Sequence, residues 1–249
     1  MTSARLAVRS AFFWTLSVLH FFPACASIVL LGALVDKRRL DPLLKLFFRN
    51  VVRCTGARLV VRHDAGFDPA RTCVFAANHV EIFDPFLVYP AIPQVARGLE
   101  LETHFRVPVY GWLMRSFGNV PVPATLTREG LERMRLRARE AIAAGTSLIV
   151  FPEGTRTRSG RVGTFKPGSF RLAIELGVPV VPVSLAGAYE LKRVGDWRLF
   201  PSTVVVQLHA PIETQGLTAE DARALAERVR GIVTEAAERS AGVLSRGSG

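Results

Sequence analysis

The sequence predicts an α/β fold in which a mixed, largely parallel sheet is wrapped by helices. Short apolar runs alternate with segments of helical period along the chain, which is the pattern of this class. The 249 residues suffice for one such domain with a sizeable core and leave little room for two. Hydrophobic residues make up 49% of the chain against 21% charged residues, which excludes a disordered chain.

The first 55 residues predict a membrane-anchoring helical segment, and residues 56–249 the α/β domain. Residues 11–35 carry no Asp, Glu, Lys or Arg and are long enough to cross a bilayer as one helix. However, Pro23 interrupts this stretch, and cationic residues flank both of its ends: Arg5, Arg9, Lys37, Arg38 and Arg39. Because positive charge favours the cytoplasmic side, a bent re-entrant helical pair or an interfacial anchor is favoured over the alternative of a single span.

A signal peptide is the competing interpretation of the same stretch. Arg5 and Arg9 precede the apolar region, and Ala24-Cys25-Ala26 has the small residues of a cleavage site. Cleavage there would leave the apolar residues 28–35 exposed at a new N-terminus, so retention is favoured. We therefore expect the α/β domain to be membrane-associated, on the cytoplasmic face of the cell membrane.

Residues 41–53 predict an amphipathic helix with Asp41 as its cap and Pro42 in its first turn. A Leu/Phe face lies opposite Lys45, Arg49 and Arg53. This pattern fits a helix that lies on an anionic membrane, and it fits equally a helix that packs against the core.

The chain has a formal net charge of +11, which suits anionic lipid headgroups, an acidic carrier protein or nucleic acid. Its arginines are spread along the whole sequence, without zinc-ligand spacing, a basic tail or a ribonucleoprotein signature, so no nucleic-acid partner is expected. The three cysteines lack CxxC spacing, and an odd count argues against a disulfide framework. A reducing environment, with no metal and no cofactor, is expected.

The first functional motif follows the buried strand predicted at 72–77 and is closed by Pro85. It reads Asn78-His79-Val80-Glu81-Ile82-Phe83-Asp84. An imidazole here can take a proton from an attacking hydroxyl, while a carboxylate on its other ring nitrogen sets its tautomer. Since the chain has no G-x-S-x-G elbow, the nucleophile is expected to belong to a substrate. The alternative is that one His and one Asp share this spacing by chance.

A second motif follows the apolar run at 147–150 and reads Phe-Pro-Glu-Gly-Thr-Arg-Thr-Arg-Ser-Gly over residues 151–160. Gly154 allows a ligand to approach the backbone closely, and the arginines offer planar forks for phosphate. An ordinary charged surface loop is the alternative interpretation of this segment.

Together, Asn-His-x4-Asp and the later Phe-Pro-Glu-Gly-Thr-Arg resemble the PlsC-like glycerophospholipid acyltransferase family. Residues 165–170 and the Val-Pro-x-x-Pro-Val pattern of residues 178–183 are similar to that family's next helix and strand, and the resemblance covers roughly residues 40–215. It implies the glycerophospholipid acyltransferase fold. It also implies acyl transfer from acyl-CoA or acyl carrier protein to the hydroxyl of a lysophospholipid, with 1-acyl-sn-glycerol 3-phosphate as the first choice and phosphatidic acid as product.

The resemblance implies His79 as the general base and Asp84 as the residue that orients it. The residues it implies for binding the acceptor are Asn78, Glu153, Gly154, Thr155, Arg156, Arg158 and Lys166. Three departures leave the acceptor open. The arginine usual after Val122 falls on Pro123 or Ala124, an upstream lysine is replaced by Glu100 and Leu101, and Glu81 stands where a small hydroxyl residue is commonest.

The alternatives are therefore another lyso-lipid acceptor, such as a lyso-ornithine lipid or a lyso-glycolipid, hydrolysis with water in place of the acceptor, and a non-catalytic lipid-binding protein on the same fold. Two more helices are predicted over 127–144 and 217–244, capped by Thr127 and Thr218. The arginine face of the first is typical of solvated surface and would also suit an acidic carrier protein. His63 and His209 have no recognisable partner and are expected to be structural.

Overall fold

One mixed sheet of seven strands lies at the centre of the computed structural model, which describes residues 3–36, 38–193 and 195–246. Its order is β1-β7-β6-β2-β5-β3-β4, and neighbouring strands are parallel except β6 and β7. The predicted fold class is confirmed. The strands are β1 (Arg58–His63), β2 (Val74–Ala77), β3 (Ala96–Leu101), β4 (Val120–Val122), β5 (Ser147–Val150), β6 (Val180–Ala186) and β7 (Thr203–Leu208).

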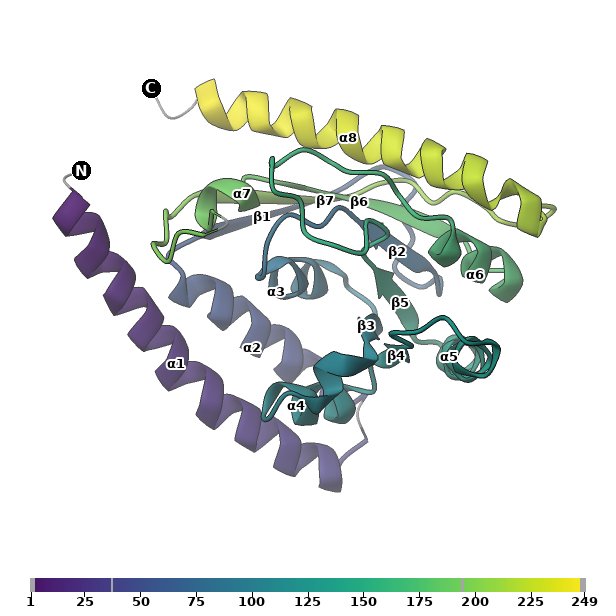
Figure 1. Cartoon of the computed structure of the whole chain (residues 1–249), viewed down its shortest axis with the longest axis horizontal. Coiled ribbons are helices and arrows are strands. Elements are labelled where there is room, and N and C mark those ends of the chain that lie inside the picture. The colour runs from purple at the N-terminus through teal and green to yellow at the C-terminus, as the bar shows by residue number, and fades with distance from the viewer. Residues whose placement is uncertain (1–2, 37, 194, 247–249) are drawn as a thin grey trace.

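Helices cover both faces of this sheet (Figure 1). One face carries α1 (Ser3–Leu34), α2 (Asp41–Cys54), α3 (Asp84–Val88) and α4 (Tyr110–Phe117), and the other carries α5 (Arg128–Ala143), α6 (Gly168–Leu176) and α8 (Ala222–Arg246). The short α7 (Ala188–Leu191) follows β6, and 3-10 turns span Tyr89–Ala91, Glu102–Arg106 and Ala219–Asp221. Two of the predicted caps are confirmed, since Thr127 accepts from Gly130 N–H and Thr218 forms a capping box with Asp221 at the 3-10 turn that leads into α8.

The N-terminal helix α1 runs without a break through Pro23, so the prediction of a bent helical pair is wrong. One face of α1 packs on the domain, where Cys25 and Ile28 are part of the core. This packing on both sides of the proline offsets the loss of one backbone hydrogen bond. The opposite face exposes large apolar side chains: Val8, Phe12, Leu16, Leu19, Phe22, Leu30 and Leu34. Lys37, one of the predicted cationic flanking residues, lies outside the described residues.

Helix α2 packs its apolar face into the core rather than leaving it for a membrane. Its buried side chains include Leu44, Phe47, Phe48, Val51 and Val52. Helix α2 lies before the predicted boundary between the anchoring segment and the α/β domain, yet it shares one core with the sheet. The boundary at residue 55 therefore stays a prediction.

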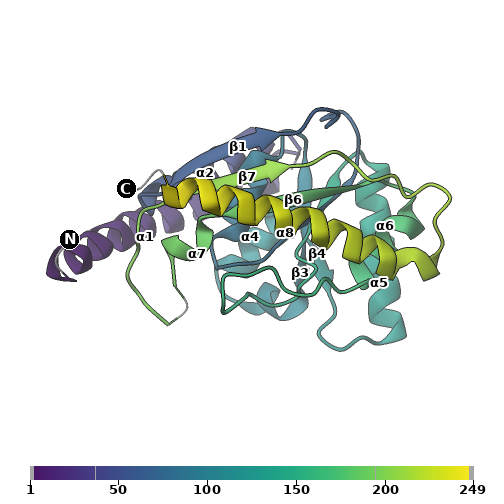
Figure 2. The same cartoon turned by 90° about the horizontal axis from the view of Figure 1, so that it is seen from above.

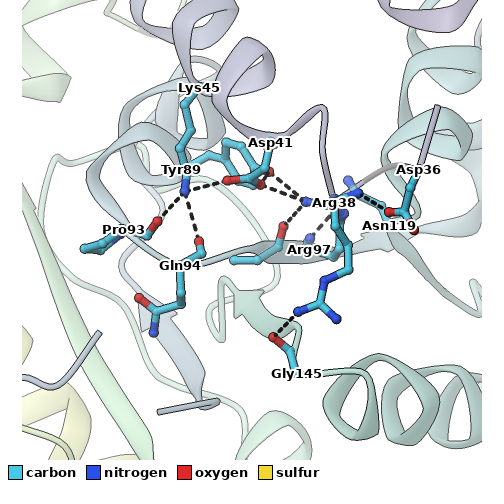
Figure 3. A network of polar contacts seen from close by, with 12 residues as sticks. Asp36, Arg38, Asp41, Lys45, Tyr89, Pro93, Gln94, Arg97, Asn119 and Gly145 are labelled. Atoms are coloured by element: carbon cyan, nitrogen blue, oxygen red, sulfur yellow. Dashed lines mark hydrogen bonds and ion pairs between the residues drawn. The ribbon is translucent and has the colours of Figure 1, made fainter. Parts of the chain in front are cut away.

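Asp41 does not cap α2, contrary to prediction. It is the first residue of the helix, and its carboxylate turns into a buried network (Figure 3). There it lies 2.6 Å from Lys45 Nζ and 3.3 Å from Arg97 Nη1 on β3, and it accepts a short hydrogen bond from Tyr89. Lys45 also donates to the carbonyls of Pro93 and Gln94. The network ties α2 to the sheet, so Lys45 is not available to a lipid surface.

Candidate functional site

The site forms where three loops meet at one edge of the sheet. Strands β5 and β6 both pair in parallel with β2, so the carboxyl ends of all three lie at the same edge. The loop after β2 carries the first motif, and the loop after β5 carries the second. The segment after β6 brings Lys192, Arg193 and Gly195 to the same place.

His79 and Asp84 form the hydrogen bond that their spacing predicts. His79 Nδ1 lies 2.7 Å from Asp84 Oδ2, and the Asp84 side chain is fully buried. Asp84 is the first residue of the short helix α3, with Pro85 in its first turn, and its side chain reaches back over the motif loop. The same Oδ2 accepts the N–H groups of Val80 and Glu81, the latter at 2.9 Å. Burial raises the pKa of Asp84, while these hydrogen bonds favour its ionised form.

The second motif holds His79 in place from the opposite side. Glu153 Oε1 accepts the backbone N–H of His79 at 2.8 Å, and its other oxygen accepts Gly163 N–H at 3.1 Å. The Phe151 ring stacks on the imidazole at a centroid distance of 4.5 Å. Thr157 N–H closes the contact by donating to the carbonyl of His79 at 2.9 Å. Burial raises the pKa of Glu153, although both hydrogen bonds counter this. Glu153 therefore positions His79, and its predicted contact with substrate stays a prediction.

Asn78 is a buried positioning residue in this geometry. Its Oδ1 accepts Leu185 N–H at 2.8 Å, and its Nδ2 donates to Leu185 C=O at 3.2 Å. Both ends of the amide are used by β6, so Asn78 holds that strand against the start of the motif. A direct contact with substrate remains a prediction.

Gly154 has φ +72°, a conformation that favours glycine. A Cβ at this position would meet Lys166 Nζ at 2.7 Å, so the lysine side chain lies close over the turn. Beyond the turn, Thr155, Arg156 and Arg158 are exposed and line a pocket of about 570 Å³.

The remaining lining of this pocket was not predicted as a site. It consists of Glu81, Ile82, Lys192, Arg193 and Gly195. Glu81 is 2% exposed, which its place in a polar motif did not indicate. In the sequence, Lys192 and Arg193 are recognisable only as a basic pair shortly after a buried strand. Such a pair indicates the site only once β6 is known to lie beside β2 and parallel to it.

The three cysteines are unsuited to act as nucleophiles, since all of them are buried. Burial raises the pKa of Cys73, at the start of β2, to about 12, which leaves no thiolate at neutral pH. A second His-Asp pair exists at His209, which is not without partners as predicted. Its Nδ1 lies 2.9 Å from Asp64 Oδ2 and its Nε2 lies 3.0 Å from Ser184 Oγ.

This Ser-His-Asp chain is structural. Ser184 and His209 are 3% and 4% exposed, and they lie on the sheet face that α8 covers. Figure 2 shows α8 running across β6 beside β7. No substrate can reach the Ser184 hydroxyl there. The hydrogen bonds among Ser184, His209 and Asp64 instead hold β6 and the end of β7 to the segment that follows β1. His63 is the other histidine predicted to be structural, and its Nε2 lies 3.4 Å from the carbonyl oxygen of Ala91.

Known proteins that are similar to this chain are acyltransferases. The family model described as Acyltransferase matches residues 52–186, which include both motif loops and the strands that carry them. A chloroplastic 1-acyl-sn-glycerol-3-phosphate acyltransferase of Brassica napus is 35% identical over 141 residues, covering 56% of this chain and 40% of that protein. The human enzyme of that name, the alpha form, is 28% identical over 235 residues, covering 92% of this chain and 80% of that protein.

The crystal structure of the 1-acyl-sn-glycerophosphate acyltransferase PlsC from Thermotoga maritima has the same fold. It superposes with a TM-score of 0.80 at 24% identity and covers 96% of this chain and 97% of that one. The chain spans about two fifths of the length of the first curated relatives that it matches, 40% and 39% for two plant enzymes.

Proposed function

Because this chain belongs to the Acyltransferase family, we propose that it transfers an acyl group from a thioester to the free hydroxyl of a lysophospholipid. The observation that carries the proposal is the His79-Asp84 pair, in which His79 Nε2 makes no hydrogen bond to a hydroxyl or thiol of the described residues. His79 removes the proton from the acceptor hydroxyl, and the alkoxide oxygen attacks the thioester carbonyl. The carbon–sulfur bond then breaks, and the imidazolium returns the proton to the leaving thiolate.

Asp84 makes this proton transfer effective. With Oδ2 bonded to Nδ1, the ring proton stays on that nitrogen and Nε2 is free to act as base. The carboxylate also stabilises the imidazolium that forms during attack. Acyl-CoA and acyl carrier protein both present the thioester that this chemistry needs, and both are proposed donors.

The acceptor that we propose is 1-acyl-sn-glycerol 3-phosphate, which would give phosphatidic acid. The curated relatives carry the name of that activity. The pocket between the two motif loops also fits a phosphate, since Thr155, Arg156 and Arg158 line it together with Glu81 of the first motif. Guanidinium groups bind phosphate bidentately, and they keep their charge at any working pH.

Arg156→Ala is expected to raise KM for lysophosphatidate by about 10- to 100-fold, corresponding to the roughly 1.5–3 kcal/mol of a charge-assisted contact. Arg156→Lys should recover only part of this, because lysine restores the charge but not the fork. Steady-state kinetics in mixed micelles measure both. Arg161→Ala is the matched control, since Arg161 is exposed on the same loop and does not line the pocket. An unchanged KM in Arg156→Ala would remove the phosphate from this part of the pocket.

We further propose that α1 holds the protein on a membrane with its apolar face in the interface. Among the described residues, α1 is the one helix long and apolar enough to cross a bilayer. Its inner face touches the site, because the Trp14 ring lies 6.0 Å from Phe83 of the first motif and Trp14 Nε1 donates to the carbonyl of Trp197 at 2.8 Å. A helix packed along the domain in this way supports an interfacial position, with the site beside the lipid surface.

Phe12→Glu and Leu19→Glu are each expected to lower partitioning onto lipid vesicles by about tenfold or more. These side chains are 62% and 68% exposed, and burying one in the interface contributes about 1.5–3 kcal/mol. Vesicle sedimentation measures the effect. Point substitutions are used because a deletion of α1 would also remove Cys25 and Ile28, which belong to the core. Leu136→Glu on α5, 56% exposed, is the control, and equal release by that variant would argue against α1 as the anchor.

A further inference from the structure

Glu81 is a buried acid that the reaction described above does not use. Its side chain is 2% exposed, and neither carboxyl oxygen has a hydrogen-bond partner among the described residues. The N–H groups of Phe83 and Ile82 favour its ionised form without reaching hydrogen-bond geometry. Glu81 nevertheless lines the pocket formed with Thr155, Arg156 and Arg158. Buried polar atoms are rarely left unpaired, so these oxygens point to a ligand that completes them.

The charges around the pocket define the chemistry of that ligand. Arg156 and Arg158 stand on the loop after β5, and Lys192 and Arg193 on the loop after β6. Four cations on two loops would repel an ammonium headgroup and attract a phosphate monoester.

Glu81 is compatible with an anion because it carries a proton. Burial and the negative charge of Asp84 raise its pKa to about 9. Of the two neighbouring buried carboxyls, Asp84 accepts three hydrogen bonds through Oδ2 and Glu81 accepts none, so the proton resides on Glu81. A neutral carboxylic acid can donate a hydrogen bond to a phosphate oxygen.

We propose that Glu81, Lys192 and Arg193 determine acceptor specificity by forming the wall of the headgroup pocket that binds a phosphate monoester. This inference rests on the proposed acyl transfer and adds to it the residues that select the acceptor. Lys192 and Arg193 bind the charge, and Glu81 donates to an oxygen that faces the interior.

The test compares lysophosphatidate with monoacylglycerol, which offers the same hydroxyl without a phosphate, in the full-length protein. Lys192→Ala and Arg193→Ala should each raise KM for lysophosphatidate about tenfold or more with kcat little changed, and should leave kcat/KM for monoacylglycerol within about threefold. Arg228→Ala on α8, an exposed arginine away from the pocket, controls for net charge. A KM that is unchanged, or that rises equally for both acceptors, would overturn the inference.

Glu81 is tested by two substitutions and a pH series. Glu81→Ala should raise KM for lysophosphatidate, and Glu81→Gln should raise it less because the amide still donates. In the wild type KM should climb above about pH 9 as Glu81 ionises, and Glu81→Gln should remove that climb. Asp84 and Lys192 act electrostatically on Glu81, and Arg156, Arg158 and Arg193 line the same pocket, so Lys192→Ala is measured in the same series.

The two levels of proposal fail differently. A wild-type protein that does not acylate lysophosphatidate overturns the proposed function and this inference together. If the wild type acylates lysophosphatidate but Glu81→Gln has the same KM and the same rise of KM at high pH, only the role of Glu81 is overturned. If the variants lower kcat/KM for monoacylglycerol as much as for lysophosphatidate, Glu81, Lys192 and Arg193 have only a structural role.

Discussion

His79→Ala is expected to lower kcat for acyl transfer by about 10²- to 10⁴-fold, because it removes the group that takes the proton from the acceptor hydroxyl. The fold should persist, since the ring is partly exposed and its main packing contact is the stacked Phe151. Steady-state turnover of labelled acyl thioester measures the loss, and thermal unfolding reports the fold.

His104→Ala is the matched control for that experiment. His104 is also paired with a carboxylate, Glu100, but its side chain is 49% exposed and it lies outside the pocket. Its removal should leave turnover near the wild-type value. A His79→Ala protein that turns over within a few-fold of wild type would exclude His79 as the base.

Asp84→Asn is expected to lower kcat by about 10³- to 10⁴-fold with the geometry largely kept. An amide NH₂ facing Nδ1 would move the ring proton to Nε2, and the imidazole could then no longer accept a proton from the acceptor. The buried amide also loses the charge that stabilises the imidazolium. Stopped-flow or steady-state release of free thiol measures the effect.

Asp64→Asn makes the same chemical change in the other His-Asp pair of the chain. Asp64 Oδ2 lies 2.9 Å from Nδ1 of the buried His209, away from the pocket. This control should lower stability and leave turnover intact. If Asp84→Asn were as active as Asp64→Asn, the imidazole of His79 would have to be oriented by another group.

The sequence was informative where a motif follows an uninterrupted apolar strand. Strands β2 and β5 are fully buried runs of four residues, so their ends could be located, and with them both motif loops. Strand β3 could not be predicted, because Arg97 and Glu100 interrupt its pattern. The charge of Arg97 is buried only because Asp41 and Tyr89 are brought to it by the fold.

The pocket shows the same limit of local patterns. Arg156 and Arg158 are part of a recognisable motif, whereas Lys192 and Arg193 follow a helix of four residues and resemble any basic pair on a surface. Only the parallel pairing of β6 with β2 brings them to the site. The course of α1 also depended on tertiary packing, since Pro23 alone suggests a break in the helix.

The central claim is that His79 activates the hydroxyl of lysophosphatidate toward a thioester. It is tested most directly by following a labelled acyl group under three acceptor conditions. Purified full-length protein is given lysophosphatidate, a lyso-aminolipid, or no acceptor, with acyl-CoA and acyl carrier protein as donors in turn. We predict that thiol release depends on acceptor, that the label appears in phosphatidic acid, and that kcat/KM favours lysophosphatidate by about tenfold or more. Thiol release at the same rate without acceptor would show a hydrolase, and a tenfold preference for the aminolipid would contradict the acceptor proposed here.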